Sequence, residues 1–296
     1  MIVDLVRVTT ADGVRLDGAC QRPSGEAQTA PLPIDAILCV HGTGGSFYTS
    51  TLFEGLAGRM LARGATVLRV NTRGHDLVST AVTSKGGKRQ GAAYEAVDDC
   101  RHDLRAWLDW LAAQGFRRVC LAGHSLGAVK AVYSLARGSH EAGAALVAIS
   151  PPRLSHSWFA ASTKRDEFQG YLATAAEHVQ SGRGETLLDV RFPLPFLVTA
   201  AGYLEKYGPD ERYNFLPLVD RVACPALYTF GGEEVERNVA FNGLPEAVEQ
   251  AAGGRQNVRV AVVPDADHFY SRHGAKLIAE IEAWLESLSR DPQGSA

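Results

Sequence analysis

Residues 119–128 read VCLAGHSLGA and carry the most informative pattern in the sequence. An apolar run leads into the motif GHSLG at 123–127, and a stretch typical of a helix follows it. Glycine costs stability in a strand or at a helix start unless the backbone needs it there. A serine between two glycines, each one residue removed, therefore indicates a sharp strand-to-helix turn that holds Ser125 in an exposed, strained position.

The rest of the chain supplies the sheet in which such a turn belongs. Two segments at the N-terminus, 2–9 and 14–20, are predicted to form an antiparallel hairpin around a turn. Further strands are predicted at 35–40, 65–70, 118–122, 145–149, 225–230 and 257–263. Runs such as AILCV and ALVAI are apolar on both faces, which favours parallel strands covered by helices on both sides. We expect an α/β fold with a mostly parallel, doubly wound sheet of about eight strands.

Helical spacing of apolar residues separates these strands. The longest helix is predicted at about 94–113, with shorter ones at 127–136 and 274–288. The long helix carries a charged cluster, which we interpret as a solvated face rather than a metal site: Asp98, Asp99, Arg101, His102 and Asp103.

Residues 153–217 interrupt the alternation of strands and helices. They favour helix, contain prolines, and hold 10 of the 24 aromatic residues of the chain. Because they follow the sixth predicted strand, we expect a helical cap over the carboxyl edge of the sheet. The core domain would then comprise 1–152 and 218–290, and 291–296 would be a disordered tail.

Composition narrows the class of protein. The 296 residues are 46% hydrophobic and 21% charged, with a formal net charge of −3, so we expect neither nucleic-acid nor membrane partners. No apolar stretch is long enough to span a bilayer, and the N-terminus lacks the layout of a signal peptide. The five cysteines, Cys20, Cys39, Cys100, Cys120 and Cys224, show no CxxC spacing. We interpret them as reduced thiols of a cytoplasmic protein and not as zinc ligands. We expect the protein to be a monomer or a homodimer.

The G-x-S-x-G stretch matches a nucleophile elbow, in which the helix after the serine directs its N-terminal N–H groups toward developing negative charge. At this point the chain resembles the α/β-hydrolase superfamily over nearly its whole length. The loop His41-Gly42-Thr43-Gly44 is similar to the family's oxyanion loop. The resemblance implies oxyanion donors at the backbone N–H groups of Leu126 and of Thr43 or Gly44.

A serine needs an adjacent base to act as a nucleophile. His268, in the stretch DADHFY at 265–270, follows the last predicted strand, where the family keeps its histidine. It would take the proton from Ser125 and pass it to the leaving group. The alternative is a histidine of a surface loop.

The histidine in turn needs an anion on its other nitrogen. The family usually places an aspartate after the preceding strand, whereas this chain has only Glu233 and Glu234 in a loop that follows Gly231 and Gly232. The family's spacing from Gly231 favours Glu234, with Glu233 as the alternative acid. Asp265 and Asp267 are closer in sequence, but we interpret them as turn formers.

Four further residues near these motifs receive structural interpretations. We expect His41 to brace the oxyanion loop and His124 to pack beside the nucleophile. His75 is predicted to be structural near the rim of the pocket. Arg73 is predicted to form a salt bridge, with contact to an acidic substrate as the alternative.

Together these residues predict a serine hydrolase that cleaves an ester or thioester of a small, mainly apolar molecule through an acyl-enzyme on Ser125. The same residues would serve acyl transfer, or hydrolysis of an amide or a C–C bond. A catalytically silent ligand-binding protein is an alternative of another class. No cofactor or metal ion is expected, because neither a dinucleotide fingerprint nor a metal-ligand cluster is present in the sequence.

Overall fold

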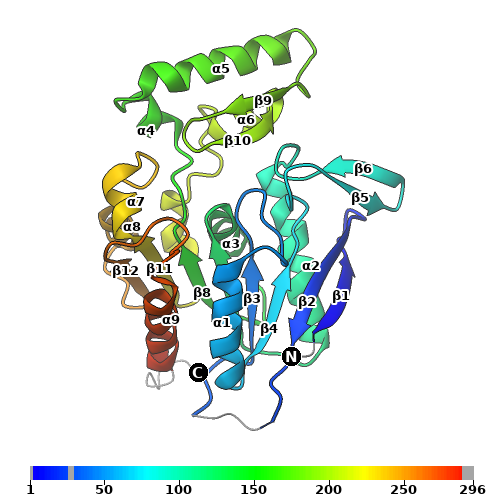
Figure 1. Ribbon diagram of the computed structural model, residues 1–296, viewed down its shortest axis with the longest axis vertical. Helices are drawn as coiled ribbons and strands as arrows, with labels where there is room; N and C mark the ends of the chain where they lie inside the picture. The colour runs from blue at the N-terminus through cyan, green and yellow to red at the C-terminus, as the bar shows by residue number, and fades with distance from the viewer. Residues whose placement is uncertain (1–2, 26–29, 289–296) are drawn as a thin grey trace.

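Eight strands form one central sheet in the computed structural model, which describes residues 3–25 and 30–288 (Figure 1). In chain order they are β1 (Asp4–Thr9), β2 (Arg15–Gln21), β3 (Ala36–Val40), β4 (Thr66–Val70), β7 (Val119–His124), β8 (Gly143–Ile149), β11 (Ala226–Gly231) and β12 (Val258–Val263). Across the sheet the order is β1-β2-β4-β3-β7-β8-β11-β12. The β1–β2 and β2–β4 pairs are antiparallel and the other pairs are parallel. The predicted α/β fold and its mostly parallel sheet are confirmed.

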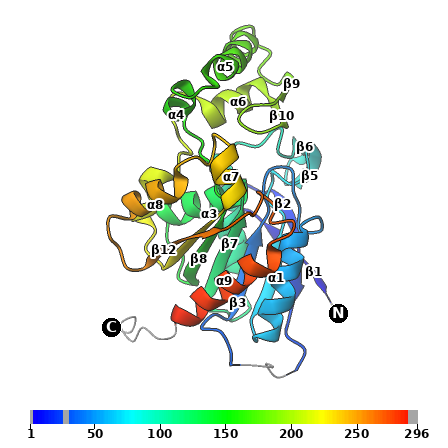
Figure 2. The same ribbon diagram turned by 60° about the vertical axis from the view of Figure 1, so that its left-hand side comes forward.

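Helices cover both faces of this sheet (Figures 1 and 2). One face carries α1 (Thr51–Ala62) and α9 (Gly274–Leu288), and the other carries α2 (Cys100–Ala113), α3 (Leu126–Arg137) and α8 (Leu244–Ala252). Alternate residues of β3 divide between the two cores, because side chains alternate along a strand. Leu38 packs in the core with α2 and α3, whereas Ile37 and Cys39 pack with α1 and α9. Both cores are therefore apolar, as the unbroken run AILCV predicts.

The structure differs from the prediction between β4 and β7 in two respects. The sequence analysis predicts no strand between residues 70 and 118, but β5 (Ser79–Thr83) and β6 (Gly86–Gln90) form an antiparallel hairpin. Its mostly exposed residues lack the alternation of apolar side chains that marks a strand in sequence. The long helix is predicted to begin at about residue 94, but α2 begins at Cys100 after one 3-10 turn at Val97–Asp99. The preceding chain stays non-helical, and the carboxylate of Glu95 turns inward to pair with Lys130.

The charged cluster lies on the 3-10 turn at Val97–Asp99 and on the first turn of α2. It is not uniformly solvated, which corrects the prediction for Asp103. This carboxylate is fully buried and accepts hydrogen bonds from the Arg73 backbone N–H at 2.9 Å, from Nε at 3.0 Å and from Nη2 at 2.8 Å. Arg73 also reaches Asp12 and Asp99. The predicted salt bridge of Arg73 is confirmed, and its charge is satisfied inside the scaffold.

The segment 153–217 lies above the carboxyl edge of the sheet (Figure 1). It contains α4 (His156–Ala160), α5 (Arg165–Gln180), β9 (Leu187–Val190), β10 (Phe196–Thr199) and α6 (Ala200–Tyr207). The predicted preference for helix holds for α4, α5 and α6, but β9 and β10 add an antiparallel hairpin that the sequence analysis does not predict. The expected boundary after residue 217 falls inside the 3-10 helix η2 (Leu216–Arg221), which packs on α3 and α8 of the core. The predicted tail, 291–296, lies outside the described residues.

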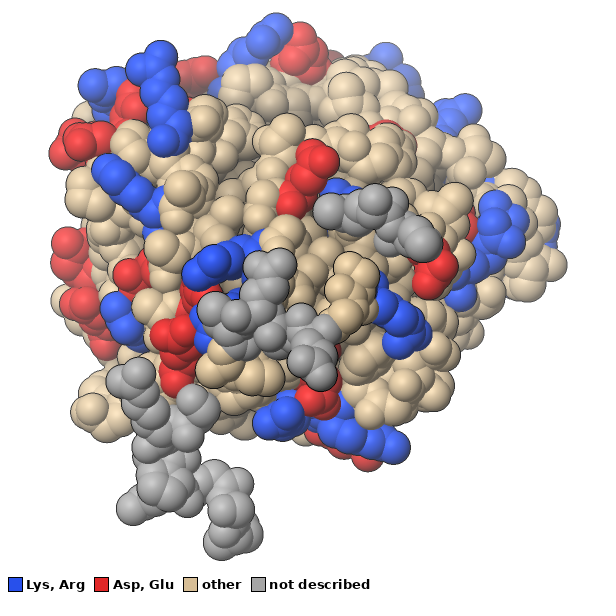
Figure 3. All heavy atoms as spheres, turned by 60° about the horizontal axis from the view of Figure 1, so that its bottom comes forward, with Lys and Arg blue, Asp and Glu red and all other residues tan. Residues whose placement is uncertain are grey.

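The surface and the cysteines add two observations. On the face turned away from the inserted segment, basic and acidic side chains are interspersed (Figure 3). All five cysteines are free thiols, four of them buried. Within residues 3–25 and 30–288, no helix has the length and apolar character needed to cross a membrane.

The buried Arg73–Asp103 pair yields a stability prediction. Asp103→Ala leaves part of the guanidinium without its buried acceptor, and we expect a loss of about 3 kcal/mol in the free energy of unfolding. Urea unfolding monitored by circular dichroism measures it. Arg105→Ala is the matched control on the same helix, since it removes an exposed pair with Asp109 and should cost about 0.5 kcal/mol or less. Equal losses in the two variants would contradict the structural role of Asp103.

Candidate active site

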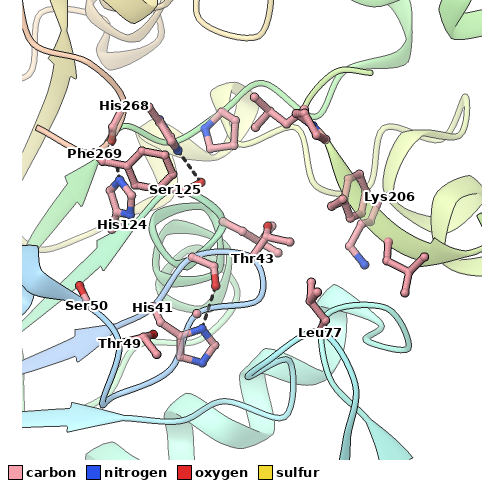
Figure 4. Close-up of a pocket in the computed structure, with 18 of the residues that line it drawn as sticks. His41, Thr43, Thr49, Ser50, Leu77, His124, Ser125, Lys206, His268 and Phe269 are labelled. Atoms are coloured by element: carbon pink, nitrogen blue, oxygen red, sulfur yellow. Dashed lines mark hydrogen bonds between the residues drawn. The ribbon is translucent and has the colours of Figure 1, made fainter. Parts of the chain in front are cut away.

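Ser125 occupies a strained backbone turn between β7 and α3. Its φ of 56° and ψ of −126° lie in a region that side chains other than glycine rarely adopt. The Ser125 N–H donates to the Ile149 carbonyl at 2.8 Å and fixes the turn against β8. Gly127 is required because a Cβ atom there would lie 2.3 Å from the Val40 carbonyl oxygen. These contacts place the Ser125 side chain at the carboxyl edge of the sheet (Figure 4).

The structure brings three of the predicted site residues together. The His268 Nε2 atom lies 3.0 Å from Ser125 Oγ, and His268 Nδ1 lies 2.6 Å from Glu234 Oε2. A carboxylate only accepts hydrogen bonds, so Nδ1 carries the proton and Nε2 accepts from the serine hydroxyl. Ser125 and Glu234 are buried, and the side chain of His268 is 18% exposed. The arrangement has the connectivity of a nucleophile, a base and an orienting acid.

Glu234 reaches His268 from a short helix rather than from the predicted loop. The helix α7 (Gly232–Arg237) begins directly after β11, and Glu234 Oε1 accepts the Gly231 N–H at 2.8 Å, a hydrogen bond that caps the helix. Gly231 also permits a close approach, since a Cβ atom there would lie 2.4 Å from the Ala266 carbonyl oxygen. The acid and the loop that carries His268 are thereby held together.

Two residues that the sequence analysis missed support this carboxylate. The Ser150 hydroxyl donates to Glu234 Oε1, and the Tyr270 hydroxyl lies 2.9 Å from Ser150 Oγ. Ser150 follows β8 directly and has a positive φ of 47°, so its position at the strand end was the available signal. Within the described chain, no lysine or arginine pairs with Glu234. Neutral donors therefore hold its charge.

The rival acids lie elsewhere. Glu233 is partly exposed and pairs with Arg237 one turn along α7. The carboxylate of Asp267 accepts the backbone N–H groups of Phe269 at 3.0 Å and Ser271 at 2.9 Å, so it shapes the turn, as predicted. Of the adjacent glutamates, only Glu234 contacts His268 among the described residues.

His124 packs beside the site and holds its histidine loop. Its Nε2 atom lies 2.8 Å from the His268 carbonyl oxygen, which only accepts, so Nε2 carries the proton. Burial lowers the pKa of His124 to about 3, and this side chain stays neutral in the pH range in which most enzymes work.

The predicted oxyanion donors face the same cavity. Thr43 and Leu126 both line it, and neither backbone N–H has an acceptor within the described part of the chain. Leu126 is the first residue of α3, where the backbone N–H has no partner inside the helix. Gly44 is not among the cavity residues, so the geometry favours Thr43 as the second donor.

His41 braces this loop as predicted. Its Nδ1 atom donates to the Gly42 carbonyl at 2.8 Å, and Nε2 accepts the Thr72 N–H at 3.1 Å. Lys130 is fully buried and donates to the Thr72 hydroxyl at 3.1 Å. Burial, with Lys130 nearby, lowers the pKa of His41 to about 4. His75 Nδ1 forms a hydrogen bond with Oδ2 of its neighbour Asp76, at 2.9 Å.

Ser125 and His268 open into a cavity of about 770 Å³ (Figure 4). The core contributes one part of its wall and the segment 153–217 contributes another. Its larger side chains are mostly apolar: Leu52, Leu77, Leu126, Leu154, Leu194, Phe196, Leu197, Tyr207 and Phe269. Three charged residues also line it: Asp189, Arg191 and Lys206. Among the described residues, no three His, Cys, Asp or Glu side chains are grouped to hold a metal ion.

Residues 37–281 match the sequence model of the family described as "Alpha/beta hydrolase family". The chain belongs to this family. A search of curated proteins finds no match for this α/β hydrolase.

Solved structures of other proteins share its fold. The esterase Pf2001 of Pyrococcus furiosus aligns over 97% of this chain and 91% of its own, with a TM-score of 0.62 and 18% identity. Est1E of Butyrivibrio proteoclasticus, in a structure with bound ferulic acid, aligns over 96% and 99%, with a TM-score of 0.63 and 15% identity. GrgF of Penicillium sp. sh18 aligns over 97% and 99%, with a TM-score of 0.68 and 14% identity. At such identities the likeness shows the fold alone.

The two buried histidines yield a prediction on pH. Their pKa values of about 4 for His41 and about 3 for His124 lie below the unfolded value of about 6.5. Because the unfolded state binds more protons, stability is lost as the pH falls below about 6.5, by up to about 1.4 kcal/mol per unit for each histidine. His124→Gln keeps an N–H donor but does not titrate. Between pH 7 and pH 5, we expect its free energy of unfolding to fall by about 2 kcal/mol less than that of the wild type.

Urea unfolding at each pH measures this difference. Between pH 7 and pH 8 the two proteins should show parallel dependence, because neither buried histidine titrates there. If the free energy of unfolding fell equally steeply with pH in the wild type and the variant below pH 6, His124 would not resist protonation in the folded protein.

Proposed function

We propose that this α/β hydrolase cleaves a carboxylic ester or thioester of a small, mainly apolar substrate through an acyl-enzyme on Ser125. The observation that carries the proposal is the unbroken chain of hydrogen bonds from Ser125 Oγ to His268, 3.0 Å, and from His268 to Glu234, 2.6 Å. A serine with a positive φ at a strand-to-helix turn is the context in which the G-x-S-x-G motif supports a nucleophile.

In the acylation step, Ser125 Oγ attacks the carbonyl carbon of the substrate while His268 Nε2 accepts the hydroxyl proton. The resulting imidazolium is stabilised by Glu234, which also keeps the proton of the neutral ring on Nδ1. The negative charge on the tetrahedral oxygen is met by the backbone N–H groups of Thr43 and Leu126, donors that are fixed before the reaction. His268 then protonates the leaving alcohol or thiol.

In the deacylation step, a water molecule gives a proton to His268 and attacks the acyl carbon bound to Ser125. The second tetrahedral intermediate collapses, the acid leaves, and the proton returns to Ser125.

We propose that segment 153–217 acts as a cap, because it supplies apolar wall residues such as Leu154, Phe196 and Tyr207. A largely apolar cavity of about 770 Å³ suits a small acyl or aryl group.

A fluorophosphonate probe tests the nucleophile and its acid. We expect one covalent adduct by intact mass on the wild type, none on Ser125→Ala, and labelling slowed by orders of magnitude in His268→Ala. Glu234→Gln removes the charge that stabilises the imidazolium, and we expect labelling slowed on the order of 10⁴-fold.

The adjacent glutamate provides the matched control. Glu233→Gln makes the same chemical change one residue earlier, at a side chain paired with Arg237, and should label at the wild-type rate. Equal slowing in both variants would contradict Glu234 as the acid. A folded wild type that forms no adduct, and hydrolyses neither short-chain nor aryl esters faster than Ser125→Ala, would contradict the proposed function and favour a ligand-binding protein.

A further inference from the structure

A buried cation lines the cavity across from the nucleophile. Lys206, near the end of α6, is 2% exposed, and Figure 4 shows its side chain on the opposite side of the pocket from Ser125 and His268. The other two charged residues of the wall, Arg191 and Asp189, are exposed and pair with each other at 3.0 Å. Lys206 is therefore the charge of this wall that is removed from bulk solvent.

The ammonium group of Lys206 is only partly satisfied by the protein. Its Nζ atom donates to the Glu95 backbone carbonyl at 2.9 Å, and this carbonyl is its one hydrogen-bond acceptor within the described residues. An ammonium group has three N–H donors, and a buried charge is costly unless it is paired. Donor capacity therefore remains on a side chain that faces the cavity.

The charges around Lys206 leave it without a carboxylate of its own. The Glu95 carboxylate pairs directly with Lys130 and not with Lys206. The nearby Glu205 lies 3.8 Å from Arg212, and burial raises the pKa of Glu205 to about 7, so a substantial fraction of it is neutral at that pH. Three cations, Lys206, Lys130 and Arg212, thus lie near two carboxylates. The Glu95 carboxylate is ionised, and the Glu205 carboxylate is only partly ionised at pH 7.

We propose that Lys206 binds a carboxylate of the substrate, so that the preferred substrate is an ester that carries a free carboxylate at a distance from its reacting carbonyl. The inference rests on the proposed function, and it refines the expectation of a mainly apolar substrate. The apolar wall then contacts the chain between the two groups, the ester lies at Ser125, and the carboxylate lies at Lys206. The competing role is that of a strut, in which Lys206 only ties α6 to the Glu95 carbonyl.

Matched esters distinguish these roles. Monomethyl and dimethyl esters of the C4 to C8 dicarboxylic acids differ only in a remote carboxylate, and acetoxy acids and their methyl esters place it on the alcohol side. For at least one chain length, we expect kcat/KM of the carboxylate member to exceed that of its neutral partner about tenfold or more. Lys206→Met should abolish this preference while the neutral ester is still hydrolysed. A wild type without preference in either series would overturn the proposal and leave the strut.

Lys164→Met is the charge-matched control. It removes one exposed cation from the same inserted segment, paired with Glu167 on the surface, and should retain the wild-type preference. An equal loss of preference in Lys164→Met would mean that net charge, and not Lys206, selects the substrate, which overturns the proposal. If circular dichroism shows that Lys206→Met does not fold, Lys206→Gln replaces it. The wild-type preference between carboxylate and neutral esters tests the proposal in either case.

A binding measurement separates this inference from the proposed function. In Ser125→Ala, which cannot form an acyl-enzyme, calorimetry with the same half-esters should show binding about tenfold tighter than with the diesters, and the difference should vanish in Ser125→Ala/Lys206→Met. Preferential binding without wild-type hydrolysis would refute the hydrolase and support Lys206 as an anion site. Hydrolysis without any preferential binding would support the hydrolase and refute the anion site.

Discussion

The backbone conformation of Ser125 is the constraint on which the rest of the site depends. A non-glycine residue with a φ of 56° is unfavourable by about 1–3 kcal/mol and persists only where its surroundings fix it. Here the Ile149 carbonyl holds the Ser125 N–H, and Gly127 lets α3 approach the carbonyl of Val40. The same turn directs both Ser125 Oγ and the N–H of Leu126 toward the cavity. Relaxing it would move the proposed nucleophile and a proposed oxyanion donor together.

The groups that hold the Glu234 carboxylate carry no net charge, and this favours the proposed chemistry. Glu234 is held by the Gly231 N–H and the Ser150 hydroxyl, which carry no net charge, whereas Arg73 and Lys130 are paired with other carboxylates in the scaffold. In the proposed mechanism, a cation bound to Glu234 would weaken its attraction for the imidazolium formed on His268. Neutral donors would fix the carboxylate in place and leave that attraction intact.

The sequence predicts best what is encoded locally. Strands such as β3 and β7, the turn at Ser125 and the loop of His268 each carry their signal within a few residues, and all lie where expected. The supports of Glu234 could not be predicted, because Ser150 lies 84 residues away and meets it only across the sheet edge. Asp103 was misjudged for the same reason, since its partner Arg73 comes from another segment. Pairing between distant residues, rather than local pattern, decides which charges are buried.

The inserted segment and the core divide the work of the cavity. The core places Ser125 and His268 on strand ends and turns, where the sheet limits their movement. The inserted segment supplies the opposite wall, and it is tied to the core where Thr199 N–H donates to the Ala93 carbonyl at 2.9 Å and Lys206 donates to that of Glu95. Because Lys206 both ties α6 to the core and lines the cavity, its ammonium is held at a defined place relative to Ser125. In the proposed reaction, a remote group bound there would position the reacting carbonyl, so that binding energy far from the bond being broken contributes to its cleavage.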